Sequence, residues 1–394
     1  MKTITRRTYL KQLALSATLG AFPSILLPKP IWADEIETQP MPTDREAATI
    51  AEIAQRYMEQ GKVPGLSVAI ARKGQFVYQH GFGDANKAAG ERVTPASLFR
   101  IASLTKPITS AAIFTLIEQG RLNLDALIFG EHGLLRFDYG ESYSDRVEKI
   151  TLQHLLTHTC GGWSNNGDDP MLRKQALNQK ELITWTIKNQ SLEFEPGTHY
   201  AYSNFGYCIL GRVIEKITGM PYVDYVQRAV LEKCGITDMR LAGNTLAQRA
   251  ANEVAYYEKN VIFINLKPPF FKITNPYSMN VARMDSHGGW IGTPSDMVRF
   301  MMHLGFKTQP SILGEQTIKS MTTTSAANPN YSCGWGITKA ASWCHDGSLP
   351  GSQTLMVRTL GGLCWAAFTN THAGGFNLHE MMWKIVKAVP AWKA

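Results

Sequence analysis

The amino-acid sequence predicts an α/β (α+β) fold in which a mostly antiparallel sheet, built from both ends of the chain, is flanked by helices. One strand-turn-strand pattern lies near the start of the chain, and four short strand patterns lie near its end. Helical spacing dominates the region between them. Strands from distant parts of a chain can share one sheet when the region between them is inserted as a separate layer. We therefore expect an inserted all-helical region, with residues 120–310 as the mainly helical insertion.

The first part of the chain predicts a helix followed by a hairpin. Residues 43–60 carry an apolar stripe at helical spacing, with a cap residue before the stripe and a glycine after it. Residues 65–71 and 75–81 predict two strands, because a short glycine-containing turn joins two segments rich in β-formers.

The rest of the chain alternates between a helical middle and a strand-rich end. Further helices are expected over residues 151–159, 179–189, 204–218, 223–230 and 294–304. Strands are expected over residues 333–337, 342–345, 353–359 and 364–368, and a last helix over 376–388. The sequence contains no internal repeat and no low-complexity segment.

The composition is that of a globular protein, with 44% hydrophobic and 18% charged residues. The net charge of +8 is concentrated at the N-terminus, because residues 1–33 contain basic residues and no acidic ones. The remainder has no basic run with interleaved aromatic side chains, so we expect no nucleic-acid partner.

The N-terminal residues predict a signal for export. A pair of arginines precedes an apolar run over residues 13–22, which is too short to span a bilayer and is followed by prolines. This pattern is typical of the bacterial twin-arginine signal, and a general secretory signal is the alternative. We expect an export signal over residues 1–33, a linker over 34–44 and a single domain over 45–394. The mature protein would then be periplasmic or secreted, without a membrane span.

The cysteines give no metal or redox motif, because none has Cys-x-x-Cys spacing. An even number in an exported protein permits disulfides, and a bridge among the three C-terminal cysteines is conceivable. The six are Cys160, Cys208, Cys234, Cys333, Cys344 and Cys364.

Ser103 and Lys106 stand three residues apart at the start of a long apolar segment. Pro107 is tolerated in a helix only in the first turn, so we expect a helix that begins near Ser103 and ends at Gly120. Residues three apart lie on one helix face, and the hydroxyl would lie at the positive end of the helix dipole. A buried lysine with a lowered pKa could act as its base, although Ser-x-x-Lys also occurs by chance.

Two more segments could complete a site for nucleophilic serine catalysis, which needs proton transfer and donors for an oxyanion. Tyr202 and Asn204 lie at a loop-to-helix junction, where a phenol beside an ammonium could share the proton. The alternative is that they only cap the helix. His345, Gly347 and Ser348 follow a short strand, and the amide of Ser348 could face an oxyanion. The alternative there is a simple β-turn.

In this order, the three segments resemble the Ser-x-x-Lys, Tyr-x-Asn and Lys/His-x-Gly signatures of the serine β-lactamase and penicillin-binding protein superfamily. The resemblance is to its class C β-lactamase-like branch, which includes D-alanyl-D-alanine carboxypeptidases and esterases. The resemblance covers about residues 45–390. Within this range, residues 152–162, 202–219 and 288–297 resemble further recurring segments of the family. It implies a β-lactamase/transpeptidase-like catalytic domain.

The resemblance implies a serine hydrolase that cleaves amide or ester bonds through an acyl-enzyme, without a metal or other cofactor. Ser103 would be acylated, and Lys106 and Tyr202 would transfer its proton. D-amino-acid peptides, small esters or β-lactam-like compounds would be the substrates. The implied substrate-binding and oxyanion positions are Asn204, His345, Gly347 and Ser348.

One departure from the family pattern bears on the substrate. His345 stands where class C β-lactamases carry lysine, and a neutral imidazole holds a carboxylate less firmly than an ammonium does. We therefore expect peptidase, amidase or esterase activity rather than efficient β-lactam hydrolysis. The alternatives are an authentic class C-type β-lactamase, or a non-catalytic or slowly deacylating penicillin-binding sensor.

Other chemistries find less support in the sequence. His154 and His158 are four residues apart, but the segment lacks the glutamate of the zinc-hydrolase motif. Cys160 lies where the family segment more often has serine, which leaves a cysteine nucleophile as a minor alternative. Gly-x-Ser-x-Gly is absent, which argues against an α/β-hydrolase.

Overall fold

The computed structural model describes residues 38–165, 169–258, 262–263, 272–273, 275–306, 308–373 and 375–392. The predicted export signal and the first residues of the predicted linker lie outside these ranges. From Thr38 onward the chain forms one compact unit. No helix in the described ranges is both long enough and apolar enough to cross a membrane.

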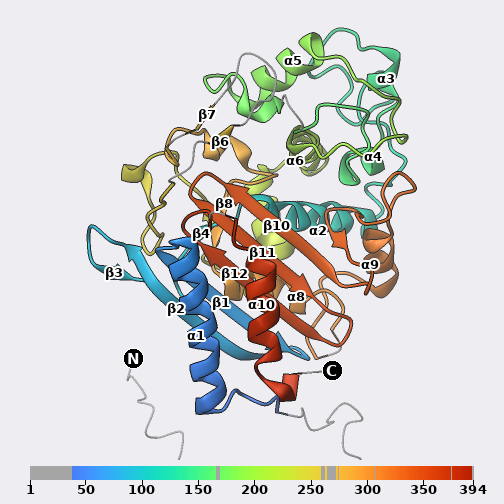
Figure 1. The fold of residues 1–394 in the computed structure, drawn as a ribbon. Helices are drawn as coiled ribbons and strands as arrows, with labels where there is room; N and C mark the ends of the chain where they lie inside the picture. Colours follow the sequence, from blue (N-terminus) through green and yellow to red (C-terminus); the bar gives the residue numbers. More distant parts are fainter. Residues whose placement is uncertain are drawn as a thin grey trace, which may run out of the picture. The chain divides into compact units, whose positions relative to one another are not determined.

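A seven-stranded sheet joins the two ends of the chain, in the order β3-β2-β1-β12-β11-β10-β9 (Figure 1). Every neighbouring pair in it is antiparallel, so the predicted fold class is confirmed. Its strands are β1 (Gly65–Arg72), β2 (Gln75–Asn86), β3 (Glu91–Arg92), β9 (Gly336–Ile337), β10 (Trp343–Leu349), β11 (Ser352–Arg358) and β12 (Leu363–Thr369). N-terminal β1 pairs with C-terminal β12, with Val68 opposite Ala367.

Most of the helices lie between the two groups of strands in the sequence. The α-helices are α1 (Asp44–Gly61), α2 (Thr105–Glu118), α3 (Asp145–Glu148), α4 (Leu152–Leu156), α5 (Gln179–Asn189), α6 (Asn204–Thr218), α7 (Tyr222–Val226), α8 (Pro294–Met302), α9 (Glu315–Thr322) and α10 (Leu378–Lys387). The shorter strands are β4 (Phe99–Arg100), β5 (Arg240–Leu241), β6 (Ile262–Phe263), β7 (Lys272–Ile273) and β8 (Trp290–Gly292).

The sheet has helices on both faces, and β1 shows why. Successive side chains of a strand point to opposite faces. Val68 and Ile70 join the apolar cluster that includes residues of α1 and α10, which pack against each other on one face. Ala69 and Ala71 join the larger cluster that includes α2 and α8. Because both faces are covered, the whole of β1 up to Ala71 is buried.

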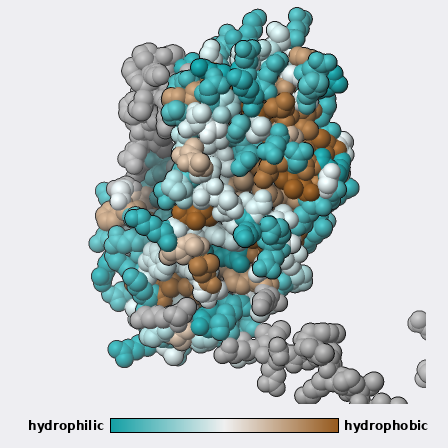
Figure 2. Space-filling model, turned by 90° about the vertical axis from the view of Figure 1, so that its right-hand side faces the viewer, coloured by the Kyte–Doolittle hydropathy of each residue, from teal (hydrophilic) through white to brown (hydrophobic). Residues whose placement is uncertain are grey.

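The helical region lies toward one end of the sheet and contains α3 to α6 (Figure 1). Helix α2 connects it to the sheet, because its residues from Thr105 to Leu116 are all buried. Figure 2 shows that the face at the right of Figure 1 is largely hydrophilic, with apolar side chains gathered mainly in one patch in its upper half.

Three expectations drawn from the sequence are wrong in detail. Helix α4 ends at Leu156, and His158 has a left-handed φ of 59°, so the helix does not reach residue 159. The strand expected over residues 342–345 is longer than predicted: β10 runs to Leu349 and includes His345 to Ser348, so the alternative of a simple β-turn there is wrong. All six cysteines are free thiols, so the conceivable C-terminal bridge is not formed.

Candidate active site

Ser103 lies on a tight turn at the start of α2. A 3-10 turn over Ala102–Leu104 precedes the helix, which begins at Thr105, two residues later than the sequence predicted. Ala102 has a left-handed φ of 50°, an unusual conformation for a residue other than glycine. Such backbone strain is concentrated at functional sites, where the surrounding structure enforces it.

Lys106 reaches the Ser103 hydroxyl, as the spacing predicts. Its Nζ lies 3.2 Å from Ser103 Oγ, 2.7 Å from Asn204 Oδ1 and 3.0 Å from the carbonyl oxygen of His287. The side chain is fully buried. Burial lowers the pKa of Lys106 to about 7, although the charge of Asp169 opposes this shift. A substantial fraction of the lysine is therefore neutral at neutral pH.

The neighbours of Lys106 fix the direction of its free electron pair. A neutral amine has two N–H bonds and one lone pair, and the two acceptors Asn204 Oδ1 and His287 O take the two N–H groups. The lone pair then faces Ser103 Oγ, where it can accept the hydroxyl proton. The arrangement is suited to a general base.

Asp169 was not singled out from the sequence, yet it orients this lysine. Its Oδ2 accepts a hydrogen bond of 2.7 Å from Asn204 Nδ2, which turns Asn204 Oδ1 toward Lys106. Its Oδ1 accepts from the backbone N–H of Met171, at 2.9 Å. Asp169 is almost completely buried, so its charge acts on Lys106 through a medium of low dielectric constant.

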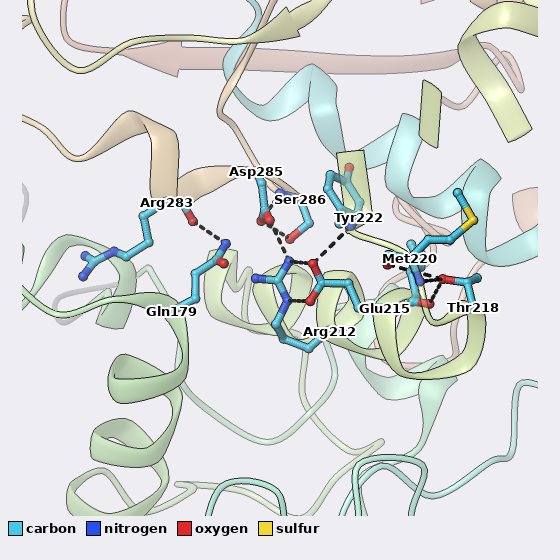
Figure 3. A network of polar contacts seen from close by, with 10 residues as sticks. Gln179, Arg212, Glu215, Thr218, Met220, Tyr222, Arg283, Asp285 and Ser286 are labelled. Carbon is cyan, nitrogen blue, oxygen red and sulfur yellow. Dashed lines mark hydrogen bonds and ion pairs between the residues drawn. The ribbon is translucent and has the colours of Figure 1, made fainter. Parts of the chain in front are cut away.

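A buried ion pair holds the segment that supplies the His287 carbonyl (Figure 3). Arg212 of α6 contacts Asp285 with an Nη2–Oδ2 distance of 2.6 Å, and its Nε also contacts Glu215. The carbonyl of Ser286 accepts a hydrogen bond from Thr109 of α2, at 2.7 Å. Helices α2 and α6 are thus tied to the same short segment, and this fixes one acceptor of Lys106.

Close backbone packing holds the same segment against α6. A Cβ atom placed on Gly211 would lie 2.6 Å from Ser286 Oγ, so only glycine permits this approach.

Tyr202 contributes a buried phenol beside the lysine. The Lys106 nitrogen lies 4.8 Å from the centre of the Tyr202 ring. Burial raises the pKa of Tyr202 far above its ordinary value, and the nearby Ser103 hydroxyl offsets this only in part. The phenol is therefore protonated at neutral pH. The buried hydroxyl lies beside that of Ser103, so a phenolic proton is placed next to the nucleophile.

His345 lies at one end of a hydrogen-bonded chain that includes His158 and Tyr331. His158 Nδ1 accepts from the backbone N–H of Ser203, so its Nε2 carries the proton and donates to Tyr331 Oη, 3.2 Å away. Tyr331 Oη lies 3.1 Å from His345 Nε2, and His345 Nδ1 donates to the carbonyl of Asp346. Burial, followed by the charge of Lys106, lowers the pKa of His345 to about 4.

This chain uses two residues whose roles the sequence does not reveal. His158 is fully buried, and its ring packs against that of Tyr202 with 4.2 Å between the ring centres and an angle of 42° between the planes. It is not paired with His154 as a metal ligand would be. Tyr331 gives no recognisable pattern in the sequence. Together they connect the segment of Tyr202 to that of His345.

Gly347 allows β10 to pass close to the turn of Ser103. A Cβ atom there would lie 2.1 Å from Thr354 Oγ1 and 2.5 Å from the carbonyl oxygen of Ile101. Thr354 also donates to that carbonyl, at 2.9 Å, which ties β11 to the same turn. Ser348 follows with an exposed side chain.

Two adjoining cavities, of about 200 and 430 Å³, open at Ser103. The residues that line both are Ser103, Asn165, Asn204 and Ser348. Every position singled out from the three sequence segments, except the buried Lys106 behind Ser103, lines at least one of these cavities. The structure therefore brings the predicted site residues together.

The electrostatic role of Asp169 can be tested through the pH dependence of activity. The acid limb of kcat/KM should lie near pH 7, where Lys106 gains its proton. Because Asp169 raises the pKa of Lys106, Asp169→Asn should lower that pKa and move the limb to lower pH. The pH dependence of kcat/KM, measured on an ester substrate for the unaltered protein and for Asp169→Asn, shows the position of the acid limb.

Asp346→Asn serves as the control, because Asp346 lies in the same cleft but is not among the groups that shift Lys106. Its acid limb should stay in place. An upward shift in Asp169→Asn, or equal shifts in both variants, would contradict the role assigned to Asp169.

A family model described as Beta-lactamase matches residues 50–388. Among curated proteins, the chain is 29% identical to penicillin-binding protein 4* of Bacillus subtilis (strain 168), over 74% of this chain and 64% of that protein. It is 24% identical to Protein flp of Staphylococcus aureus, over 74% of this chain and 56% of that protein. The chain thus spans less than two thirds of the length of these relatives.

Solved structures share the fold. A D-amino acid amidase from Ochrobactrum anthropi SV3, solved with L-phenylalanine amide, is similar with a TM-score of 0.70, 21% identity and coverage of 88% of this chain and 99% of that one. EstCE1, described as a hydrolase with promiscuous acyltransferase activity, has a TM-score of 0.70, 20% identity and coverage of 87% and 98%. The family match extends over nearly the whole described chain and includes the Ser103 site, and the chain therefore belongs to the Beta-lactamase family.

Proposed function

We propose that the protein is an exported bacterial serine hydrolase that cleaves amide or ester bonds through an acyl-enzyme on Ser103. The observation that carries the proposal is the position of Lys106, whose lone pair faces the hydroxyl while two fixed acceptors hold its N–H groups. A pKa of about 7 leaves it able both to accept and to return a proton near neutral pH. The penicillin-binding relative, the amidase neighbour and the hydrolase EstCE1 support the same reaction class.

In the proposed reaction, Lys106 takes the proton of Ser103 while Oγ bonds to the substrate carbonyl carbon. The negative charge on the carbonyl oxygen is stabilised by the backbone amides of Ser103 and Ser348. When the bond to the leaving group breaks, Tyr202 gives its phenolic proton to the leaving group and takes the proton held by Lys106 in return. Water then attacks the ester on Ser103 and releases the acid.

The charges of the cleft favour neutral or basic substrates over carboxylates. His345 is neutral, and neither arginine nor lysine occurs among the described residues that line the two cavities. Asp169 and Asp346 contribute carboxylates to them. An anionic β-lactam would therefore meet no lysine or arginine among the described lining residues, so we propose peptides, amides or esters as substrates.

A substrate panel tests this proposal. Turnover of a short p-nitrophenyl ester, a D-amino-acid amide, a D-alanyl dipeptide and a chromogenic cephalosporin should be compared for the purified protein and for Ser103→Ala. We expect the ester or an amide to have the highest kcat/KM and Ser103→Ala to be inactive on all four. Faster turnover of the cephalosporin than of every other compound would contradict the proposed substrate class.

The cellular location rests on the N-terminal sequence. We propose that residues 1–33 direct export by the twin-arginine route and that residues 45–394 form the catalytic domain in the periplasm or outside the cell. The free thiols in the structure are compatible with this, because a domain of this size does not need disulfides for its core.

A further inference from the structure

A second hydrogen-bonded chain meets the cleft at Ser348. Ser348 Oγ lies 2.8 Å from Nε2 of His372, a residue that follows β12. His372 Nδ1 lies 2.6 Å from Oε2 of Glu258. The three residues come from distant parts of the sequence, and none of this chain except Ser348 was singled out from it.

The carboxylate of Glu258 selects the tautomer of His372. A carboxylate can only accept, so His372 Nδ1 carries a proton and donates it to Glu258. In this tautomer of the neutral imidazole, Nε2 has a lone pair that accepts the hydroxyl proton of Ser348. Ser348 Oγ then presents only lone pairs to the cleft. It is therefore an acceptor for a donor group of a bound molecule.

Glu258 holds the ring of His372 in this orientation because its own position is fixed. Its side chain is fully buried, and its Oε2 also accepts a hydrogen bond of 2.9 Å from the backbone N–H of Gly351, in the turn between β10 and β11. His372 keeps about one fifth of its side chain exposed. A negative charge that is buried and held in place at the far end of the chain strengthens the acceptor character of Ser348.

The position of Ser348 relates this acceptor to the nucleophile. Ser348 lines both cavities that open at Ser103, and Leu349 and Pro350 continue one of them. In the other cavity Asp346, a carboxylate paired with His379 at 2.7 Å, lies two residues away along β10. The described lining offers no lysine or arginine that would compete for these acceptors.

We propose that Ser348, held by His372 and Glu258, is a subsite that accepts a hydrogen bond from an amino group of the acyl substrate. Ser348 contacts the substrate, whereas His372 and Glu258 are positioning residues. The inference rests on the proposed function and deepens it, because it names amino-bearing amides and esters as the preferred substrate class.

The test compares two ligands that differ only in the amino group, D-phenylalaninamide and 3-phenylpropionamide. Each is added at increasing concentration while a fluorophosphonate labels Ser103, and the concentration that halves the labelling rate is measured. In the unaltered protein, D-phenylalaninamide should protect Ser103 at a concentration about tenfold lower than 3-phenylpropionamide does. This is the difference expected for one hydrogen bond that involves a charged donor.

Two variants probe the chain. Ser348→Ala removes the acceptor. His372→Asn places an amide where Nδ1 was, so it can still donate to Glu258, but its shorter side chain does not reach Ser348. Both should reduce the tenfold preference to about twofold or less. His303→Asn is the matched control, because His303 Nδ1 donates to the carbonyl of Pro310 on the exposed surface. The preference of this variant for D-phenylalaninamide should stay near tenfold.

The outcomes separate this inference from the proposed function. An unchanged preference in Ser348→Ala and His372→Asn, with Ser103 still labelled, would overturn the subsite and leave the nucleophile in place. Absence of Ser103 labelling in the unaltered protein would overturn both. Labelling of Ser348 in Ser103→Ala would overturn the subsite in favour of a second nucleophile, since a serine, a histidine and a carboxylate in this order can also activate a hydroxyl.

Discussion

Replacing Ser103 with alanine is expected to lower kcat for ester hydrolysis by about 10⁴-fold or more, because no other hydroxyl takes its place at Lys106. The backbone amide and the turn geometry remain, so binding of a ligand should change little. The measurement is kcat and KM on the best ester of the panel, with the inhibition constant of the product as the check on binding.

Ser110→Ala is the matched control for this substitution. Ser110 also lies on α2, and its hydroxyl donates to the carbonyl of Cys333 at 2.7 Å, away from the cavities. Its loss should cost about 1 kcal/mol in the free energy of unfolding while the rate of acylation stays near that of the unaltered protein. Equal kinetic losses in both variants would point to a folding defect and against a specific role of Ser103.

Replacing Lys106 with methionine is expected to lower the acylation rate by about 10²- to 10⁴-fold, the usual contribution of a positioned base. Methionine has a similar length but cannot accept or donate a proton, so the site keeps its volume and loses its base. The residual activity should also lose the acid limb near pH 7 that the lysine produces. Pre-steady-state labelling rates between pH 5 and 9 measure both effects.

The stability of the same variant separates catalysis from folding. Burial lowers the pKa of Lys106 from its ordinary value of 10.5 to about 7, so between these pH values the unfolded chain binds a proton that the folded chain does not. The free energy of unfolding of the unaltered protein should therefore rise across this window. Lys106→Met should lack this increment, whatever the loss of its hydrogen bonds to Asn204 and His287 costs at every pH. An increment of the same size in Lys106→Met would contradict the account of a buried, partly neutral lysine.

Elements of the fold could be predicted from the sequence where residues close together in the chain determine them. Residues 204–218 were predicted as a helix and form α6 with the same bounds, because Ser203 caps its start and Gly219 ends it in a left-handed conformation. The hairpin of β1 and β2 was found in the same way. The spacing of Ser103 and Lys106 implied a contact, and the two side chains are 3.2 Å apart.

The parts of the site that were missed depend on tertiary placement. Asp169 and Tyr331 lie on loops whose sequence has no distinctive pattern, and the acceptor at His287 is a backbone carbonyl, which any residue carries. A simple β-turn at Gly347 was left open as an alternative, whereas pairing with Thr354 of β11 keeps this residue in a strand. Glycine is needed there because β10 passes close to the backbone of Ile101, which lies far away in the sequence.

The most direct test of the central claim is to locate the covalent adduct. The protein is treated with a fluorophosphonate, the intact mass is measured, and the proteolytic peptides are sequenced by mass spectrometry. We predict a single adduct on Ser103, which is absent from Ser103→Ala and forms far more slowly in Lys106→Met. An adduct on any other residue, or labelling that persists in Ser103→Ala, would contradict the assignment of Ser103 as the nucleophile.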